Sequence, residues 1–511
     1  MELPITLDQA SRQSLQAQLF DQLRSLVLGG RLKPGTPLPA TRALSEQLGV
    51  SRNTVLLAYE RLIAEGYLQT RTAVGTFVSF ELPEDSLTLK AAGRAGEAAP
   101  ERPPARQPVA FRGRAQAVVN RQWLAYDFWL GRPDPHSFPI KTWRRLLNRA
   151  LVTAGTRFTE YRDPAGMLEL RQAIANHLGP ARGIKVDPEQ IVIVAGCQEA
   201  LNVTARLLLR EGARAAIENP SYQGAAYLLH SYRAKLVPVA VDENGLCVEA
   251  LPRKGAAIVY VTPSHQYPLG FTLSLERRLR LLDWAQRTGA YIIEDDYDSD
   301  FRYRGSPLAA LMGLDSHGCV IYLGTFSKSM GAGLRLGYLV VPRHLAEPAR
   351  TVKALLDNGH PWLDQAAMAE FIANGAYNNH LRRIRHLYGA RRDCLVECLR
   401  KHFGDVPLSG TESGMHIAWH LPDSFPSALE LQEMAAVRSV GIYSLQSGAA
   451  FDFGGCAYSE RAVVLGYSSL DEQQIRAGIE RVAAALDEWH ARSRSARRAP
   501  VDRPIPARRT Q

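Results

Sequence analysis

The chain has 511 residues, of which 46% are hydrophobic and 22% charged, with a formal net charge of +10. This length allows a large domain and a smaller one, the composition is that of a globular protein, and the positive charge favours a polyanionic partner. Six cysteines without a CxxC pair favour a reducing compartment over a disulfide framework, and no metal site is expected. The N-terminus lacks a signal-peptide pattern and no apolar run is long enough to span a bilayer, so we expect a cytoplasmic protein.

Residues 1–80 are expected to form a small separate domain. Apolar periodicity, turn residues and a Ser N-cap predict three helices followed by two short strands, at 14–29, after Pro39, from Ser51 to Ala64, and at 66–69 and 75–78. This order of elements predicts a winged helix-turn-helix domain.

The segment from Leu32 to Leu68 resembles the winged helix-turn-helix of GntR-type regulators almost position for position. The resemblance implies binding to a double-stranded DNA operator. Its recognition helix would offer a first turn of donors and acceptors to the major groove, and a residue of the preceding helix would reach a phosphate or a base edge. These predicted DNA-binding residues are Ser51, Arg52, Asn53 and Thr54 in the recognition helix, and Arg42 in the helix before it. Arg61 lies late in the helix, where a solvated face is the alternative.

The remaining chain divides by composition. Residues 81–118 are rich in Ala, Pro, Gly and Arg and predict a flexible linker, and the basic stretch 489–511 predicts a disordered tail. Residues 119–488 alternate helices with apolar strands, which predicts an α/β domain around a mainly parallel sheet. The strands are expected at 191–194, 215–217, 257–261, 291–294 and 320–323, and helices at 168–178 and 275–286.

Lys328 is set among small residues and hydroxyls between Tyr322 and Tyr338, with Arg335 seven positions on. A shielded lysine can form a Schiff base with a carbonyl-bearing cofactor, while an arginine and hydroxyls hold an anion. Asp295 lies at the end of an apolar strand, where α/β sheets place their ligands. Together these features predict a site for a cofactor that carries a carbonyl and a phosphate.

Residues 120–488 are similar to fold type I aminotransferases, which bind pyridoxal 5'-phosphate and have a smaller C-terminal α+β subdomain. The resemblance implies that Lys328 forms the internal aldimine, Asp295 pairs with the pyridine nitrogen and Tyr297 bonds the ring's phenolic oxygen. It further implies an aromatic side chain stacked on the ring, a phosphate-binding site, and a homodimer in which the partner subunit contributes a tyrosine. These residues are Tyr222 for stacking, Gly196, Cys197, Gln198, Thr325, Ser327 and Arg335 for the phosphate, and Tyr161 from the partner.

Two departures from the aminotransferases mark a subfamily. Ser264-His265-Gln266-Tyr267-Pro268 replaces the usual Asn-Pro-x-Gly, and it and the string from His380 to Tyr388 are typical of MocR/GabR-type regulators within the GntR family. Val464 stands where aminotransferases place the arginine that grips the substrate α-carboxylate. Arg461 is three positions away, which on a strand would point it to the other face.

The sequence therefore predicts a transcriptional regulator that senses an amine, an amino acid or pyridoxal phosphate itself through Lys328. The alternative is an active aminotransferase with a fused DNA-binding domain, which Lys328, Asp295 and Tyr297 permit and which Val464 and Tyr267 argue against. At most residual transaminase activity is expected. The effector, the operator and the choice between activation and repression stay open.

Overall fold

The computed structural model describes residues 3–11, 13–71, 74–82, 124–305 and 308–498, which belong to two compact units, 1–107 and 108–511. All of the predicted linker except residues 81–82 lies outside the described residues, so its flexibility stays a prediction. No helix in the described part of the chain is long and apolar enough to cross a membrane.

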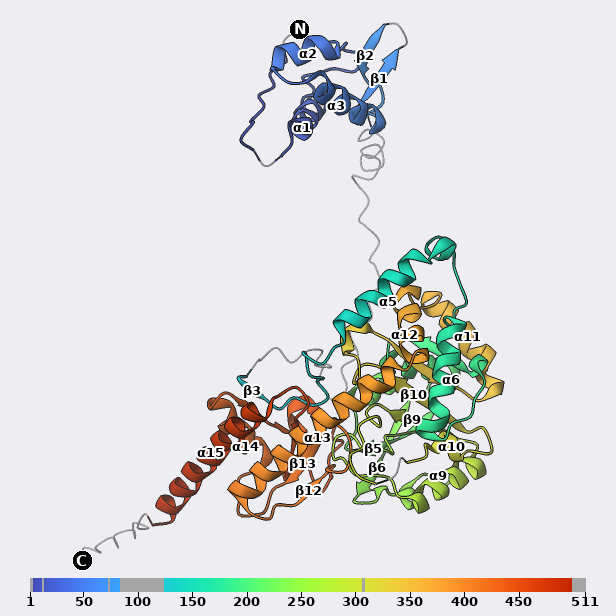
Figure 1. The fold of residues 1–511 in the computed structure, drawn as a ribbon, viewed down its shortest axis with the longest axis vertical. Helices are drawn as coiled ribbons and strands as arrows, with labels where there is room; N and C mark the ends of the chain where they lie inside the picture. Colours follow the sequence, from blue (N-terminus) through green and yellow to red (C-terminus); the bar gives the residue numbers. More distant parts are fainter. Residues whose placement is uncertain (1–2, 12, 72–73, 83–123, 306–307, 499–511) are drawn as a thin grey trace, which may run out of the picture. The chain divides into compact units, whose positions relative to one another are not determined.

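The smaller unit, drawn in blue in Figure 1, is the winged helix-turn-helix that the sequence predicts. Leu19, Leu44 and Leu62 are fully buried in the core that its helices share. The Ser51 hydroxyl accepts from the Thr54 N–H at 3.1 Å, so the third helix begins at the predicted cap. The elements are α1 (Leu15–Leu28), α2 (Thr41–Leu48), α3 (Arg52–Ala64) and the antiparallel wing strands β1 (Leu68–Arg71) and β2 (Gly75–Val78).

The larger unit is built on an eight-stranded sheet, as the predicted α/β class requires. Its strands, in spatial order, are β4 (Ile191–Val194), β11 (Gly337–Val340), β10 (Val320–Thr325), β9 (Tyr291–Asp296), β8 (Ala256–Val261), β5 (Arg214–Asn219), β6 (Lys235–Asp242) and β7 (Gly245–Leu246). The central pairs, from β10 to β6, are parallel, whereas β11 runs antiparallel to both of its neighbours and β7 runs antiparallel to β6. The five predicted strands are confirmed. Sequence patterning missed β6, in which Lys235, Pro238 and Ala240 are exposed, and β11, whose first two residues end the stretch read as a cofactor motif.

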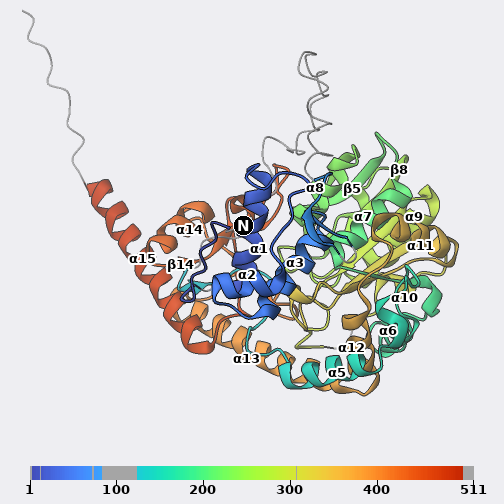
Figure 2. The same cartoon turned by 90° about the horizontal axis from the view of Figure 1, so that it is seen from above.

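Helices cover both faces of this sheet, as buried parallel strands require (Figures 1 and 2). One face packs on α7 (Cys197–Leu208), α8 (Gln223–Ser231) and α11 (Ala346–Asp357). The other packs on α9 (Leu275–Thr288) and, towards β4, on α6 (Leu168–Arg182) and α12 (Trp362–Ala373). Shorter elements complete the unit: α5 (Ile140–Val152), α10 (Leu311–Leu314), and the 3-10 helices η1 (Gly155–Phe158), η2 (Pro188–Gln190), η3 (Val248–Ala250), η4 (Ala332–Leu334) and η5 (Arg343–Leu345).

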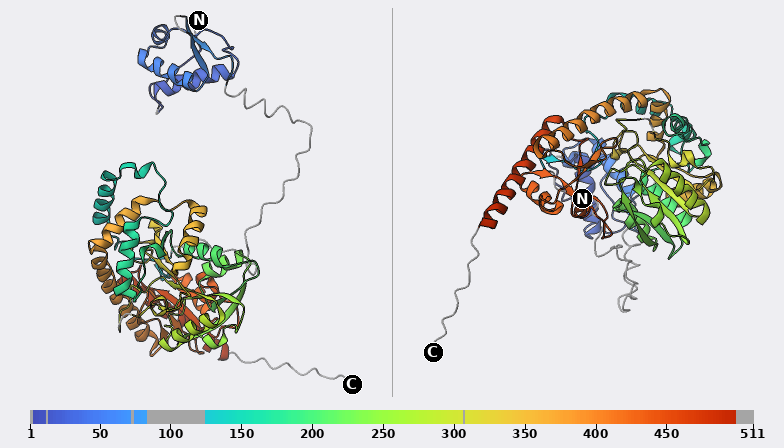
Figure 3. Two further views of the ribbon diagram at one scale, coloured as in Figure 1. Left: turned by 90° about the vertical axis from the view of Figure 1, so that its right-hand side faces the viewer. Right: turned by 90° about the horizontal axis from the view of Figure 1, so that it is seen from below.

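A smaller C-terminal α+β lobe confirms the predicted subdomain. Its antiparallel sheet has the order β12 (Leu408–Ser409), β13 (His416–His420), β16 (Ala462–Gly466), β15 (Tyr443–Ser444). The long helices α13 (Ala376–Phe403) and α15 (Glu472–Arg498), orange and red in Figure 3, lie side by side in it. The lobe also holds α14 (Ala428–Val437), the one-turn π-helix η6 (Leu445–Ala449), and β14 (Val440–Gly441), which pairs with β3 (Tyr126–Asp127).

The predicted disordered tail is wrong for residues 489–498, because α15 continues to Arg498. Ile475, Ile479, Val482 and Leu486 form a buried stripe at helical spacing, and this packing sustains the helix. The arginines and alanines that follow are good helix formers, so the helix continues beyond the packed stripe. Residues 499–511 lie outside the described residues.

Candidate functional site

A cavity of about 300 Å³ opens where the parallel strands of the main sheet end. The segments that follow β4, β5, β8, β9 and β10 all reach it, as expected for the carboxyl edge of such a sheet. Every predicted cofactor residue except Tyr161 lines it: Gly196, Cys197, Gln198, Tyr222, Asp295, Tyr297, Thr325, Ser327, Lys328 and Arg335. Residues that the sequence did not single out also line it, among them Trp129, Leu130, Gly131, Tyr260, Thr262 and His416.

Lys328 follows β10 and points its amino group into this cavity. Its Nζ donates to the Gly131 carbonyl at 2.9 Å. Gly131 has a φ of +65°, and a Cβ at this position would lie 2.5 Å from that nitrogen, so only glycine fits. Burial lowers the pKa of Lys328, and the nearby carboxylates of Asp298 and Asp295 oppose the shift. A lysine with a lowered pKa keeps more of its amine neutral and nucleophilic.

Asp295, near the end of β9, carries an unsatisfied oxygen. Its Oδ2 accepts from the Tyr260 hydroxyl at 2.7 Å, whereas its buried Oδ1 accepts from no nitrogen or oxygen donor among the described residues, and the nearby Cys197 thiol also favours the charged carboxylate. Burial raises the pKa of Asp295 to about 6. A buried carboxylate oxygen without a donor is costly, and a protonated ring nitrogen in the cavity would satisfy it. Tyr260 escaped prediction because it reads as one more apolar strand residue, although buried tyrosines need a partner for the hydroxyl.

Arg335 and the amino end of α7 form an anion-binding corner. The Arg335 guanidinium lines the cavity and has no ion-pair partner among the described residues. Gly196 precedes α7 with a φ of +109°, and a Cβ there would lie 3.5 Å from that guanidinium. The Thr325 hydroxyl donates to Ser327 Oγ at 3.0 Å beside them. Helix N-termini and unpaired arginines are the groups that proteins use to bind phosphate.

Aromatic rings form a wall of the cavity. The Tyr267 ring lies edge-on to Tyr222, Tyr297 and His416, with centroid distances of 5.7, 5.8 and 5.8 Å. Burial raises the pKa of Tyr222 to about 12, so its hydroxyl stays protonated at neutral pH. Tyr267, which replaces the usual asparagine, is therefore part of an aromatic cluster and not an isolated substitution.

Val464 lies in β16 and is fully buried in an apolar cluster with Leu130 and Leu269. Arg461 precedes the strand and donates to the carbonyls of Phe425 and Pro426 at 3.0 and 3.2 Å, and it does not line the cavity. Lys328 and Arg335 are the only lysine or arginine side chains among the described residues that line the cavity. Neither Val464 nor Arg461 therefore offers a positive charge to the cavity.

Tyr161 lies outside the cavity, with 90% of its surface exposed. Large apolar side chains nearby in the sequence are exposed as well, at Leu151, Val152 and Phe158. This segment has the exposure expected of a surface that a second subunit covers.

The predicted DNA-binding residues gather at the first turn of α3 and at the start of α2. Ser51, Arg52 and Asn53 are exposed and Thr54 is half-buried. The Arg52 Nε lies 3.4 Å from the Thr41 hydroxyl, which links the two helices of the motif, and Arg42 pairs with Glu46 in solvent. Arg61 instead pairs with Glu65 at 2.9 Å and covers the Phe20 ring, which supports the solvated-face alternative.

Comparisons with known proteins agree with the architecture of both units. Residues 15–78 match the bacterial regulatory proteins of the gntR family, and residues 128–481 match aminotransferase class I and II. The chain is 38% identical over 489 residues to the probable rhizopine catabolism regulatory protein MocR of Rhizobium meliloti, covering 94% of this chain and 96% of that protein. The chain belongs to the MocR-type regulators of the GntR family. It is a transcriptional regulator that binds DNA through its winged unit.

Other relatives and solved structures extend the match. The pyridoxine biosynthesis regulator PdxR of Corynebacterium glutamicum is 33% identical over 488 residues, covering 95% of this chain and 99% of that protein. An archaeal alanine:glyoxylate aminotransferase superposes with a TM-score of 0.66 at 26% identity, covering 72% of this chain and 91% of that one. LysN from Thermus thermophilus, complexed with N-(5'-phosphopyridoxyl)-L-leucine, superposes with a TM-score of 0.64 at 28% identity, covering 72% and 93%. The free Asp295 oxygen and the unpaired Arg335 fit the cofactor that this fold carries, and the larger unit binds pyridoxal phosphate.

We predict that Asp295→Asn stabilises the cofactor-free protein at pH 8. Burial raises the pKa of Asp295 from 3.8 to about 6, so folding favours its protonated form, and this contribution is lost as pH rises through 6. The variant removes the buried charge and should gain up to about 3 kcal/mol at pH 8 and almost nothing at pH 4. Thermal melting of cofactor-free protein at both pH values measures the difference. Asp405→Asn, at an exposed site, is the control, and equal gains for the two variants would contradict the prediction.

Proposed function

We propose that this regulator carries pyridoxal phosphate on Lys328 and that an amine, an amino acid or the cofactor itself, acting at this lysine, changes how the winged unit binds its operator. The observation that carries the proposal is the buried, unpartnered Oδ1 of Asp295 in the cavity into which Lys328 points. When bound, the cofactor supplies an aldehyde carbon that condenses with primary amines and a ring that withdraws electrons.

Each lining residue then has a role that its position supports. Asp295 would hold the proton of the ring nitrogen, Tyr297 would donate to the ring oxygen, and Tyr222 would cover the face of the ring. The Gly131 carbonyl holds Lys328 Nζ in place before the cofactor arrives. Gly196, Cys197, Gln198, Thr325, Ser327 and Arg335 would bind the phosphate.

We further propose a homodimer in which the partner's Tyr161 completes the phosphate cradle. The 90% exposure of this ring, and the exposed apolar side chains before it, support this assembly. The linker, residues 81–118, would join each winged unit to its own cofactor unit.

Val464 does not itself line the cavity, but Leu130 of the same apolar cluster does, and this bears on the class of effector. A carboxylate placed against this buried cluster would lose its water without gaining a cation. We therefore propose that a simple amine, or the cofactor itself, suits the site better than an α-amino acid. The same feature argues against steady transamination of amino acids.

Lys328→Ala should lose the cofactor adduct. Wild-type protein loaded with pyridoxal phosphate and reduced with borohydride should gain the mass of one phosphopyridoxyl group per chain on the peptide with Lys328, since the lysine nitrogen supplies the bond. Lys185→Ala, at an exposed lysine, should keep the full adduct. Equal labelling of the Lys328→Ala variant would show that another lysine carries the cofactor.

The loaded protein should respond more strongly to an amine than to the matching amino acid. In a spectral titration, phenethylamine should half-saturate the response at a concentration at least about tenfold lower than phenylalanine, because the carboxylate of phenylalanine would meet the apolar side of Leu130 and find no arginine at position 464. Lys328→Ala should respond to neither compound. Tighter binding of phenylalanine would reveal a carboxylate-binding group outside the residues that line the described cavity.

Arg52→Ala should weaken operator binding by about 1–3 kcal/mol, as expected for the loss of an arginine that contacts a base or a phosphate. The operator can be isolated by selection from random duplexes, and a mobility-shift titration at fixed salt measures the affinity. Arg61→Ala is the matched control, because Arg61 already pairs with Glu65, and its effect should be clearly smaller. The reverse ranking of the two variants would place the DNA on the other end of α3.

A further inference from the structure

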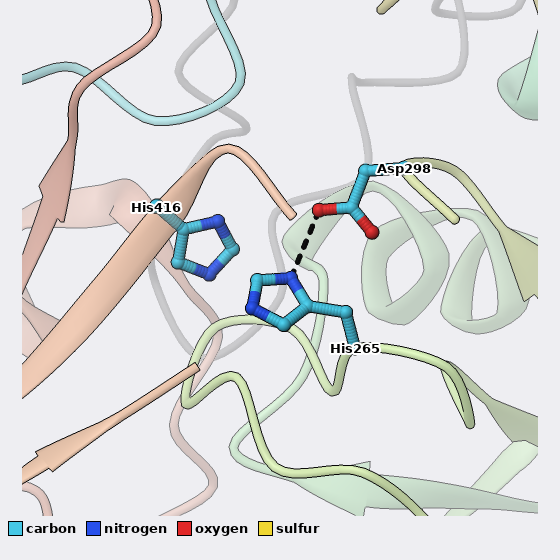
Figure 4. Close-up of side chains that lie close together, drawn as sticks. All are labelled: His265, Asp298 and His416. Atoms are coloured by element: carbon cyan, nitrogen blue, oxygen red, sulfur yellow. Dashed lines mark hydrogen bonds and ion pairs between the residues drawn. The ribbon is translucent and has the colours of Figure 1, made fainter. Parts of the chain in front are cut away.

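The His265 imidazole bonds to the carboxylate of Asp298 (Figure 4). Its Nδ1 is 2.9 Å from Asp298 Oδ2 and 3.1 Å from the Tyr297 hydroxyl. That hydroxyl donates to the main-chain carbonyl of His265 at 3.0 Å. The carboxylate is the stronger acceptor, so Nδ1–H points to Asp298 and the tyrosine hydrogen points to the carbonyl. A lone pair of the hydroxyl then faces the histidine.

Both members of this pair are withdrawn from solvent: 1% of His265 and 3% of Asp298 is exposed. The Asp298 carboxylate is bonded to the His265 imidazole, and the Tyr297 hydroxyl is also within hydrogen-bonding reach of it. A buried carboxylate held by neutral donors is kept at a cost in stability, which indicates that its charge has a use at this place.

Three glycines fix the imidazole where it is. Gly270, Gly410 and Gly414 all have positive φ, and a Cβ on Gly270 or Gly410 would lie 2.9 or 2.8 Å from Nε2. A Cβ on Gly414 would lie even closer to the ring and to the Asp298 carboxylate. The ring is therefore packed by main chain on several sides and cannot turn away from Tyr297.

His265, Asp298 and His416 also offer three ligand atoms within 4.8 Å of one another, which is a spacing that a metal ion could use. However, Nδ1 of His265 is already committed to Asp298, and Nε2 of His416 lies 3.0 Å from the Pro268 carbonyl. The glycines leave no space beside Nε2 of His265. The arrangement is that of a hydrogen-bonded pair and not of a metal centre.

We propose that Asp298 and His265 are positioning residues, which hold the Tyr297 hydroxyl at the cavity wall, where its hydrogen can turn from the His265 carbonyl to the cofactor's ring oxygen, and which place a negative charge near Lys328. This inference rests on the proposed function of Lys328. It gives a task to the histidine of the Ser-His-Gln-Tyr-Pro string, which no cofactor contact accounts for.

The charges around the Asp298–His265 pair support this role. The Asp298 carboxylate raises the pKa of Lys328 against the effect of burial, and it raises the pKa of Tyr297 together with burial. Removal of this charge should therefore lower the pKa of both groups. The other titratable groups that face them are Asp295 on β9, Cys197 on α7, His416 on β13, and Tyr222 and Tyr267 on the aromatic wall.

The test compares Asp298→Asn with wild type in full-length protein loaded with pyridoxal phosphate. The amide can still accept from His265 but carries no charge. The midpoint of the pH-dependent absorbance should fall by about one unit, a tenfold loss in proton affinity. Asp300→Asn is the matched control, because that carboxylate accepts from the Tyr377 hydroxyl at 3.2 Å and is not among the groups that shift Lys328 or Tyr297. Its midpoint should stay at the wild-type value.

Variants at His265 test the positioning of Tyr297 separately from the charge of Asp298. His265→Ala should weaken cofactor binding by about tenfold in a dissociation titration, since the donor to Asp298 is lost and Tyr297 is no longer held. His265→Asn places an amide N–H near the position of Nδ1 and should restore most of that affinity. Thermal melting of the cofactor-free variants shows whether a loss comes from misfolding.

An unchanged midpoint in a well-folded Asp298→Asn protein, or equal affinities of the Asn and Ala variants at His265, would overturn the proposal. So would a stoichiometric transition metal in purified wild-type protein that His416→Ala removes. If wild-type protein shows no absorbance from a Lys328 adduct, the proposed function itself fails, and this outcome is distinct from the others.

Discussion

The buried carboxylate of Asp295 is the constraint around which the cofactor unit is organised. Main-chain parallel pairing brings β8, β9 and β10 together, so Tyr260 can donate to one oxygen of Asp295 and Lys328 reaches the same cavity. The other oxygen has no donor, and the fold tolerates the cost because helices cover both faces of the sheet and bury a large apolar area. Without a ligand this oxygen costs stability, and a protonated ring nitrogen bound in the cavity would relieve that cost.

The second subfamily string, from His380 to Tyr388, lies in α13 and does not line the cavity. Its contacts show that it supports the site. His380 Nε2 lies 2.8 Å from the carbonyl of Ser329, the residue after Lys328. Arg385 donates to the main-chain carbonyl of Asp300 at 2.9 Å, shortly after the acidic end of β9. The string therefore supports the lysine loop and the acidic loop from behind. A sequence signature of this kind indicates a scaffold for the site and not a ligand contact.

The sequence was sufficient to predict the winged domain, five of the eight strands of the main sheet and the residues that gather at their ends, because caps, apolar runs and strand-end acids are local features. Tyr260 and Gly131 were missed, since a tyrosine inside an apolar strand and a glycine in a loop show their use only when Asp295 and Lys328 lie beside them. The extension of α15 was missed because the composition after His490 suggests disorder. Packing of the preceding turns starts a helix, and good helix formers continue it.

The position of the cavity explains how a cofactor site could serve a regulator. A ligand shifts an equilibrium only by binding one state better than another, so the site must touch parts that can move against each other. The loop with His265 and Tyr267 belongs to the main sheet, whereas His416 and Gly414 belong to the C-terminal lobe, and these groups meet directly behind Tyr297. A shift of the aromatic side chains would therefore alter the contacts at the junction of the two lobes. Val464 stands in place of the arginine that binds the substrate α-carboxylate in aminotransferases. This junction is therefore kept, whereas the usual contact to an amino-acid substrate is absent.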